Sequence, residues 1–186
     1  MILLAGKVCR LRPLQRADAQ RTRVWRNDPE IRDAILGYRF PVTEIMESQW
    51  YEKLLSDPGG ARALFGIEDL SDESLAGYIQ LTAIEWIHRT GILGISIGDK
   101  SRHGRGIGSE AILLMLRYAF DCLNLRKIRS EVVGFNQRAL RLHVRLGFRE
   151  EGRLKEQIYL EGAYHDLHQM AILEREFRQR DEIPRS

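Results

Sequence analysis

Cysteine and long apolar runs are scarce in this sequence of 186 residues, and these scarcities exclude several classes of protein. Its two cysteines, Cys9 and Cys122, cannot build a disulfide framework, and no Cys and His residues have zinc-site spacing, so we expect no metal. No apolar run approaches the ~18 residues of a membrane span, and the N-terminal run is too short for a signal peptide. The sequence therefore predicts a cytoplasmic protein with no membrane partner.

An excess of charge of one sign is also lacking. The 29 Lys+Arg residues almost balance the 26 Asp+Glu residues, which leaves a net charge of +3. Because the acidic residues are dispersed among the basic ones, no basic face is indicated, and we expect no nucleic-acid partner. Arginine outnumbers lysine, a bias that reflects either genome composition or the bidentate contacts of arginine with phosphate and carboxylate groups.

What is present is the composition of a globular protein. Hydrophobic residues make up 44% of the chain, and no repeat, long linker or low-complexity segment divides it. A chain of this size buries roughly 70% of its extended surface, which is enough for a core without cross-links. We therefore predict a single domain that spans residues 1–186.

The order of strand and helix signals is that of an α/β protein. Short connections within the middle of the chain, and within its last part, predict antiparallel strand pairs. We predict one mixed, mostly antiparallel central sheet of about seven strands, flanked by about four helices. The predicted strands are Lys7–Pro13, Ala61–Glu68, Leu75–Ile87, Gly91–Ile97, Lys127–Val133, Arg149–Leu160 and Ala163–Leu173. The predicted helices are Arg16–Trp25, Glu44–Leu55, Gly106–Leu123 and Asn136–Leu146.

Several smaller predictions accompany this layout. The segment Asn27–Pro29 is predicted to be a turn, because proline disfavours helical backbone at the preceding residue. Cys122 falls on the apolar face of the predicted helix Gly106–Leu123 and is predicted to lie in the core. The Arg-rich tail Arg175–Arg185 is predicted to be a frayed end. The three tryptophans are predicted to be core residues or groove walls: Trp25, Trp50 and Trp86.

A glycine-rich loop is the most informative segment. Gly98–Ala111 leads from a predicted strand into a predicted helix through three alternate glycines. Glycine permits a tight turn and a close approach of a ligand to the backbone, and the free amides of a helix start attract anions. Arg102, His103 and Arg105 add positive charge. The loop therefore predicts a cradle for a phosphate or diphosphate group.

Three other interpretations of this loop compete with the phosphate cradle. A P-loop requires a lysine after the glycines, which is absent here. The spacing Gly106-x-Gly108-x-x-Ala111 fits a dinucleotide-binding fingerprint, but the preceding strand ends an antiparallel meander instead of opening a βαβ unit. The chain that remains after the loop is also too short for a second half of such a domain. A structural turn without a ligand stays open as an alternative.

Four segments, in order along the chain, resemble the GNAT N-acetyltransferases. His103–Gly108 resembles the acetyl-CoA signature Arg/Gln-x-x-Gly-x-Gly/Ala, and Asn136–Ala139 followed by Leu146–Phe148 resembles the second signature. Trp25–Glu30 and Gly152–Met170 are similar to the branch that holds the ribosomal-protein N-terminal alanine acetyltransferases. The resemblance covers nearly the whole chain. It implies a GNAT-type fold, in which the sheet is splayed at a cofactor gap.

The resemblance also implies acetyl-CoA as co-substrate and a set of residues that bind it. The backbone of Ile95–Ile97 would pair with the pantetheine arm, and the amides of Arg105–Ser109 would hold the pyrophosphate. Asn136 would bind pantetheine or order water, and His103 stands where the family usually has Arg or Gln. Arg138 and Arg141 either reach the 3′-phosphate or form a solvated face. The implied cofactor-binding residues are Ile95, Ser96, Ile97, His103, Gly104, Arg105, Gly106, Ile107, Gly108, Ser109, Asn136, Arg138 and Arg141.

The implied chemistry is direct attack of an amine on the thioester, which requires a neutral amine. Deprotonation at pH 7 costs about 1.4 kcal/mol for an α-amine and about 4–5 kcal/mol for a lysine-like amine. Glu85 is the first candidate base, and its alternative is an exposed strand-end carboxylate. Glu131 is either a second candidate base or part of a buried salt bridge. His143 occupies the position of the family's catalytic tyrosine, and it is either the general acid or a core residue.

The acceptor is the least determined part of the function. The resemblance implies a protein N-terminal α-amine. The alternatives are a small amine, such as an aminosugar, a polyamine or an antibiotic, and a non-catalytic acyl-CoA-binding module. The acceptor-facing segments, residues 28–40 and 156–164, mix acidic, basic and aromatic residues and do not decide between them. A homodimer is also considered.

Overall fold

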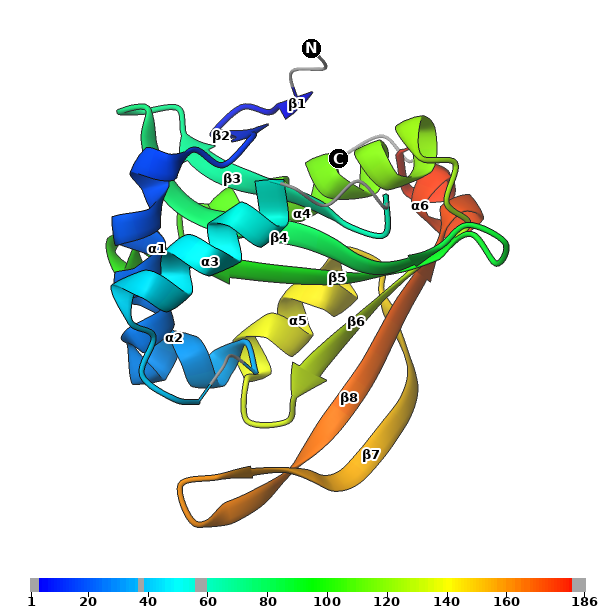
Figure 1. Cartoon of the computed structure of the whole chain (residues 1–186). Coiled ribbons are helices and arrows are strands. Elements are labelled where there is room, and N and C mark those ends of the chain that lie inside the picture. Colours follow the sequence, from blue (N-terminus) through cyan, green and yellow to red (C-terminus); the bar gives the residue numbers. More distant parts are fainter. Residues whose placement is uncertain (1–3, 37–38, 56–59, 182–186) are drawn as a thin grey trace.

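One mixed sheet organises the computed structural model, which describes residues 4–36, 39–55 and 60–181 (Figure 1). Within these residues, eight strands form the sheet in the order β1-β2-β3-β4-β5-β6-β8-β7. Only the pair β5–β6 is parallel among the strand pairs of the described chain. The strands are β1 Leu4–Ala5, β2 Cys9–Arg12, β3 Ala63–Asp69, β4 Ser74–Glu85, β5 Thr90–Ile97, β6 Lys127–Val133, β7 Arg149–Leu160 and β8 Ala163–Leu173. The expected α/β layout with a mostly antiparallel sheet is confirmed.

Helices cover both faces of the sheet. On one face, Trp25, Ile31 and Tyr51 come from three successive helices and pack with Tyr78 of β4 in a small apolar cluster. On the other face, the apolar side of α4 packs into the main core, together with side chains of α5 and α6. Figure 1 shows α3 crossing in front of the sheet. The helices are α1 Ala19–Asn27, α2 Pro29–Ala34, α3 Glu44–Leu55, α4 Ile107–Arg117, α5 Gln137–Arg145 and α6 Glu174–Asp181.

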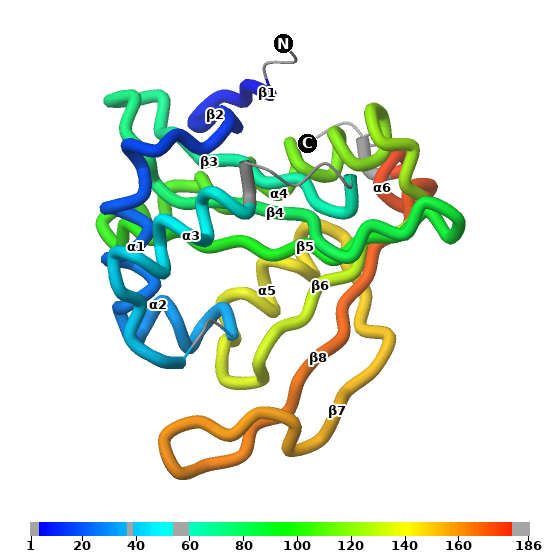
Figure 2. The backbone as a smooth tube through the Cα atoms, in the orientation of Figure 1, coloured from blue at the N-terminus to red at the C-terminus, as the bar shows by residue number. Residues whose placement is uncertain are grey.

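The sheet opens between β5 and β6. These strands pair only where Thr90–Ile92 lies beside Lys127–Arg129. From there β6 follows β8 along its whole length while β5 continues beside β4 to Ile97, so the two strands diverge (Figure 2). The divergence leaves Leu93–Ile97 without a neighbouring strand on the side of β5 that faces β6. The expected splay of the sheet is therefore confirmed.

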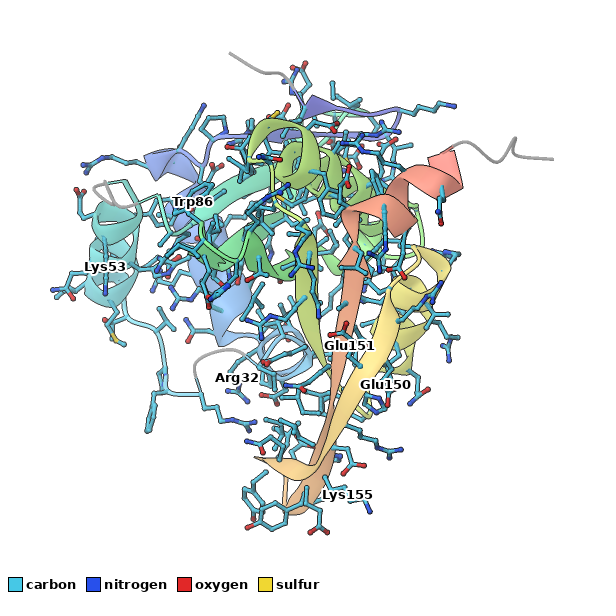
Figure 3. All side chains as sticks on the ribbon, turned by 90° about the vertical axis from the view of Figure 1, so that its right-hand side faces the viewer. Arg32, Lys53, Trp86, Glu150, Glu151 and Lys155 are labelled. Atoms are coloured by element: carbon cyan, nitrogen blue, oxygen red, sulfur yellow. The ribbon has the colours of Figure 1, made fainter. Side chains whose placement is uncertain are left out.

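The last two strands project from the body of the molecule as a two-stranded arm (Figures 1 and 3). Its turn contains Glu161 and Gly162, with φ values of 48° and 83°. Two successive residues with positive φ are typical of the tight hairpin turns that match strand twist. The predicted hairpin and its turn are therefore confirmed.

Two predictions about helices need correction. The Asn27–Pro29 turn is present, but a short helix, α2, begins directly at Pro29, with Asp28 as its N-cap. Asp28 Oδ1 accepts the Glu30 amide at 3.0 Å, and proline suits the first helical position because its missing N–H has no partner there. The frayed tail is wrong for residues up to Asp181, because α6 forms and buries Phe177 against Phe120. The rest of that tail, 182–186, lies outside the described residues.

Cys122 and Trp86 also differ from expectation. Cys122 is exposed. The helix after Arg117 becomes a π-helical turn over Tyr118–Cys122, in which the Leu123 amide bonds Tyr118 O five residues back. A wider turn shifts the helical face, so the apolar periodicity of α4 no longer points Cys122 inward. Trp86 is 50% exposed at the β4–β5 connection, whereas Trp25 is buried.

Among the described helices, none combines the length and the apolar content that crossing a membrane requires.

Candidate active site

The glycine loop owes its shape to two residues with left-handed backbone. Gly104 and Gly106 have φ values of 83° and 84°, a region that strains residues with a Cβ atom. A Cβ at either position would meet no atom within 4 Å, so the backbone conformation and not crowding calls for glycine. The His103 imidazole Nε2 lies 2.9 Å from Ile97 O and ties the loop to the end of β5.

The start of α4 presents free backbone donors. Gly106 is the N-cap, and no side chain caps the helix. The first amides of a helix have no intrahelical acceptor, so those of Ile107, Gly108 and Ser109 remain available to a ligand. All three residues line a cleft of about 600 Å³. Aligned amides at a helix start form an anion site, which fits a pyrophosphate group.

The arginines beside this loop serve the fold more than a ligand. Arg102 is buried and donates to Asp72 Oδ2 at 2.6 Å, to Asp99 Oδ2 at 3.0 Å and to Asp69. Hydrogen bonding from Arg102 lowers the pKa of Asp72, so this carboxylate stays ionised. Arg105 Nη1 lies 3.2 Å from Asp69 Oδ2. Arg102 lines the cleft, but its charge is matched by these carboxylates. That the two guanidinium groups flank the pyrophosphate stays a prediction.

The cleft collects residues from four parts of the chain. It lies between the end of β5, the glycine loop, α2 and α5. All but one of the expected cofactor-binding residues line it. These are Ile95, Ser96, Ile97, His103, Gly104, Gly106, Ile107, Gly108, Ser109, Asn136, Arg138 and Arg141. The exception is Arg105, whose side chain turns to Asp69 and Ser71.

Helix α5 supplies the basic wall of the cleft. Asn136 is its N-cap: Oδ1 accepts the Ala139 amide at 3.0 Å, and Nδ2 donates to Ala34 O at 3.2 Å. Asn136 thus joins α5 to the end of α2. Arg138 and Arg141 are exposed, and within the described residues neither forms an ion pair. Two unneutralised guanidinium groups at the cleft fit a phosphate.

Helix α2 supplies the opposite wall; the sequence predicted that residues 28–40 face the acceptor, but it did not predict this helix. Glu30, Ile31, Ala34 and Ile35 line the cleft. The missed signal was local: an N-cap Asp followed by Pro and Glu is a helix start. The turn predicted at Asn27–Pro29 gives no helical face, so the sequence did not show which residues of the segment point into the cleft.

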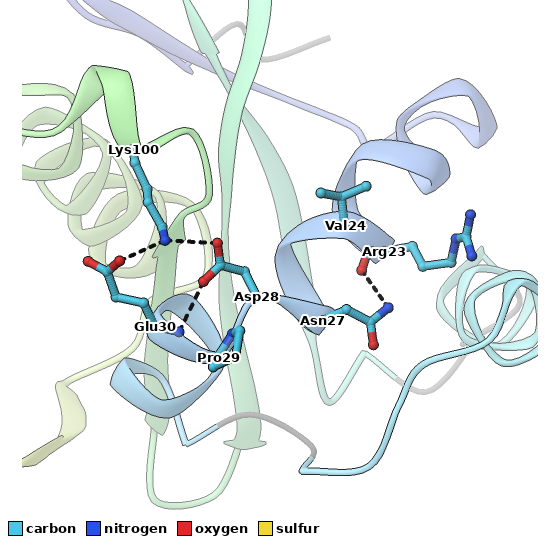
Figure 4. A pocket seen from close by; sticks show the side chains of 7 residues that line it. All are labelled: Arg23, Val24, Asn27, Asp28, Pro29, Glu30 and Lys100. Atoms are coloured by element: carbon cyan, nitrogen blue, oxygen red, sulfur yellow. Dashed lines mark hydrogen bonds and ion pairs between the residues drawn. The ribbon is translucent and has the colours of Figure 1, made fainter.

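A second, more open hollow of about 730 Å³ adjoins the cleft and shares Glu30 with it (Figure 4). Lys100 Nζ lies 2.8 Å from Asp28 Oδ2 and 2.6 Å from Glu30 Oε2. These contacts raise the pKa of Lys100 and lower that of Asp28, chiefly through the hydrogen bond between them. The α2 side of the mouth therefore carries two carboxylates, both held by Lys100, and Arg23 also lines the hollow.

His143 lies in the core behind the α5 wall. It is 3% exposed, and it is not among the described residues that line the cleft. Nδ1 lies 2.8 Å from Ala139 O, so this nitrogen carries the proton, and Nε2 accepts from the Ser130 hydroxyl at 3.0 Å. Burial lowers the pKa of His143, which keeps the imidazole neutral. The ring also packs edge-on against Phe148. Its role as general acid stays a prediction.

The two candidate bases are exposed strand residues. Glu85 ends β4 and pairs with Thr90, at the opposite end of β5 from the glycine loop. Glu131 lies on β6 opposite Gln169 of β8, and no salt bridge of the described residues includes it. Neither is among the described residues that line the cleft. Their catalytic roles stay predictions as well.

Comparison with known proteins agrees with this geometry. The profile of the acetyltransferase (GNAT) domain matches residues 9–149. Spermidine N(1)-acetyltransferase of Vibrio cholerae is 35% identical over 71% of this chain and 74% of that protein, and the Escherichia coli K12 enzyme is 29% identical over 94% and 91%. The crystal structure of the Vibrio cholerae enzyme with CoA and spermine superposes with a TM-score of 0.85 at 29% identity, covering 93% of this chain and 99% of that one.

These relatives correct the expected branch. Similarity to spermidine N-acetyltransferases extends over more than nine tenths of the chain. YdaF of Bacillus subtilis, with a proposed ribosomal N-acetyltransferase activity, is 34% identical over only 61% of this chain and 63% of that protein. The small-amine alternative is thus better supported than a ribosomal-protein acceptor. The Vibrio cholerae enzyme is dodecameric in one structure, and the homodimer considered for this chain stays a prediction.

Proposed function

The chain belongs to the GNAT acetyltransferase family, and from this premise we propose that it transfers the acetyl group of acetyl-CoA to a primary amine of a polyamine. The observation that carries the proposed acceptor is the similarity to spermidine N-acetyltransferases over nearly the whole chain, in a fold that superposes with a TM-score of 0.85. A protein N-terminal amine is the acceptor that this proposal replaces.

The distribution of charge around the cleft supports the proposal. Arg138 and Arg141 line the α5 wall, and Glu30 lines the α2 wall beside Asp28. Clefts lined by one sign of charge raise the local concentration of oppositely charged ligands. An anionic cofactor on the α5 side and a cationic amine on the α2 side would each meet complementary charge.

The chain's residues divide the work between binding and orientation. The amides of Ile107, Gly108 and Ser109 hold the pyrophosphate at the start of α4, and the unpaired edge of β5 pairs with the pantetheine arm. Acetyl-CoA supplies an activated thioester to the site. A backbone amide of Ile95–Ile97 polarises its carbonyl, which stabilises the oxyanion formed on attack.

The acceptor must lose a proton before it attacks. A primary amine with a lysine-like pKa of ~10.4 costs about 4–5 kcal/mol to deprotonate at pH 7. Glu85 and Glu131 remain the candidate bases that this step requires, and His143 the candidate acid for the leaving thiolate. Because the fraction of neutral amine increases with pH, the rate of acetyl transfer should also rise with pH until the ionisation of another group limits the rate.

The acceptor is tested with a panel of amines at saturating acetyl-CoA. Spermidine and spermine are compared with glucosamine and with a short peptide that begins with alanine. We expect kcat/KM to be at least about tenfold higher for the polyamines, as each 1.4 kcal/mol of extra attraction gives this factor. Thiol release and the mass of the acetylated amine are measured together. Preference for the peptide, or CoA binding without thiol release for any amine, would contradict the proposal.

The basic wall of α5 yields a second expected result. We expect the double variant Arg138→Ala with Arg141→Ala to raise the Kd of CoA at least about tenfold, because even one charged hydrogen bond to a phosphate is worth roughly 1.5–3 kcal/mol. The Kd of 3′-dephospho-CoA should not change. Calorimetric titration of both ligands measures the difference, and an equal loss for both would place the two arginines away from the 3′-phosphate.

A further inference from the structure

Ser96 has a buried hydroxyl group that the fold leaves without a hydrogen bond. Two buried side-chain oxygens of the described residues lack such a bond, Glu68 Oε1 and Ser96 Oγ. The Glu68 carboxylate is compensated by its ion pair with Arg10. Ser96 is only 2% exposed and has no charged partner. A buried hydroxyl with no partner costs stability, and alanine would avoid that cost, so its presence calls for an explanation outside the fold.

The Ser96 side chain lies on the α2 side of the cleft. Side chains alternate along a strand, and Ile95 and Ile97 pack against the main core beneath α4. Ser96 therefore projects from the opposite face, where Tyr78 is its partner across the β4–β5 pair. Ser96 and Ile31 of α2 both line the cleft. Ser96 thus borders the cleft, and its unpaired hydroxyl lies on the face that α1, α2 and α3 cover.

On this face Ser96 has a residue without a side chain on either side of it along the strand. Residues 94 and 98, two positions before and after it, are glycines. The face of Gly98 is covered by Trp25, since a Cβ there would lie 1.9 Å from the indole. At Gly94 the nearest group is the Gln80 amide, 3.4 Å from such a Cβ. Between Ser96 and the point where β5 and β6 separate, this face of β5 therefore presents backbone at Gly94, and the Ser96 hydroxyl lies beside it.

The pantetheine arm is not the natural partner of this hydroxyl. An arm that pairs with β5 as a strand lies in the plane of the sheet and meets the backbone groups of Ile95–Ile97. The Ser96 side chain stands perpendicular to that plane. A group that approaches the thioester from the α2 side passes over Ser96, and the acceptor amine is such a group.

We propose that Ser96 is a positioning residue for the acceptor, whose amine N–H donates a hydrogen bond to Ser96 Oγ while the nitrogen lone pair faces the thioester carbonyl. This inference rests on the proposed acetyl transfer to an amine and specifies which residue of the α2-side face orients it. Burial raises the pKa of Tyr78, the partner of Ser96 across the β4–β5 pair, so its phenol stays neutral. Ser96 Oγ is an uncharged hydrogen-bond acceptor, and it therefore favours the neutral form of the amine, which is the reactive form.

The test compares Ser96→Ala with the wild-type protein in three measurements. We expect the melting temperature of the free protein not to fall, because the hydroxyl has no partner to lose. The Kd of CoA should stay within about twofold, and kcat/KM for the preferred amine should fall about tenfold, the loss of one good hydrogen bond. An unchanged kcat/KM, or a loss explained wholly by weaker CoA binding, would overturn the inference.

Two serine variants serve as controls. Ser130 is also buried, but its hydroxyl bonds His143 Nε2 at 3.0 Å, so Ser130→Ala should lower the melting temperature where Ser96→Ala does not. Ser48→Ala removes an exposed hydroxyl from α3 and should change neither stability nor turnover. Binding of spermine to the CoA-loaded protein is measured as well. If the wild-type protein acetylates no amine, the proposed function fails. Ser96→Ala must still weaken spermine binding, and equal binding would overturn the inference separately.

Discussion

Gly106→Val is expected to raise the Kd of CoA at least about 100-fold while the protein remains folded. Gly106 is the N-cap of α4 with φ 84°, and valine in this conformation is strained by roughly 1–2 kcal/mol or more. The backbone relieves the strain by leaving the left-handed region, which turns the first amides of α4 away from the pyrophosphate. Loss of two hydrogen bonds to a charged group, each worth roughly 1.5–3 kcal/mol, accounts for the expected factor.

Gly162→Val provides the matched control for this strain. Gly162 has φ 83° in the β7–β8 turn, and a Cβ there also meets no atom within 4 Å. Both variants should therefore lose similar stability, but only Gly106→Val should lose CoA binding. Calorimetric titration gives the Kd, and chemical denaturation gives the free energy of unfolding. Equal CoA affinity in both variants would show that the start of α4 does not hold the pyrophosphate.

Arg102→Met is expected to lower the free energy of unfolding by about 3–5 kcal/mol, the usual effect of removing one partner of a buried ion pair. Arg102 links three carboxylates, and Asp69 among them is only 2% exposed. Methionine fills similar space without charge, so Asp69 would lose its buried partner. The carboxylates also join the β3–β4 connection to the loop after β5, so the glycine loop should loosen.

The matched control is Arg105→Met, because the Arg105 side chain is 48% exposed although it contacts the same Asp69. Exposed ion pairs contribute about 0–1 kcal/mol, so this variant should unfold nearly like the wild-type protein. Urea denaturation measures both variants. If the two variants lose similar stability, burial of the Arg102–Asp69 ion pair does not account for the loss in Arg102→Met.

The effect of Arg102 also has an expected pH dependence. The hydrogen bond from Arg102 is the main cause that lowers the pKa of Asp72, so its pKa in the folded protein lies below the unfolded value of ~3.9. Stabilisation from this pair is therefore complete above about pH 5 and is lost as the pH falls below about 4. The stability difference between wild type and Arg102→Met should be constant at neutral pH and shrink in acid.

The cofactor half of the site was predictable because its residues are close in the chain. The glycines, the helix start and the end of β5 are consecutive, so their relation depends on local backbone preferences and not on packing. Asn136, Arg138 and Arg141 were reached only through the resemblance, yet they too line the cleft. Residues 28–40 were expected to face the acceptor, but helix α2 within them was not predicted, because a six-residue helix has too few residues to show periodicity.

Ionisable residues were less predictable than the loop. Arg102 lies in the glycine loop, but its partners Asp69 and Asp72 come from a connection about thirty positions away in the chain. Nothing in the local sequence distinguishes an arginine that binds phosphate from one that binds these carboxylates. His143 shows the same limit, since only packing against Phe148 and Ser130 places it behind the cleft.

The sequence by itself determined the α/β order of elements, the candidate anion site at the start of α4 and the family, because these depend on periodicity, on glycine backbone freedom and on contiguous motifs. Tertiary structure alone decided which walls enclose the cleft, which arginines keep their charge free and that the Ser96 hydroxyl has no partner. Those properties arise from contacts between residues far apart in the chain. Burial and charge pairing are properties of such contacts, and a residue's type and spacing do not specify them.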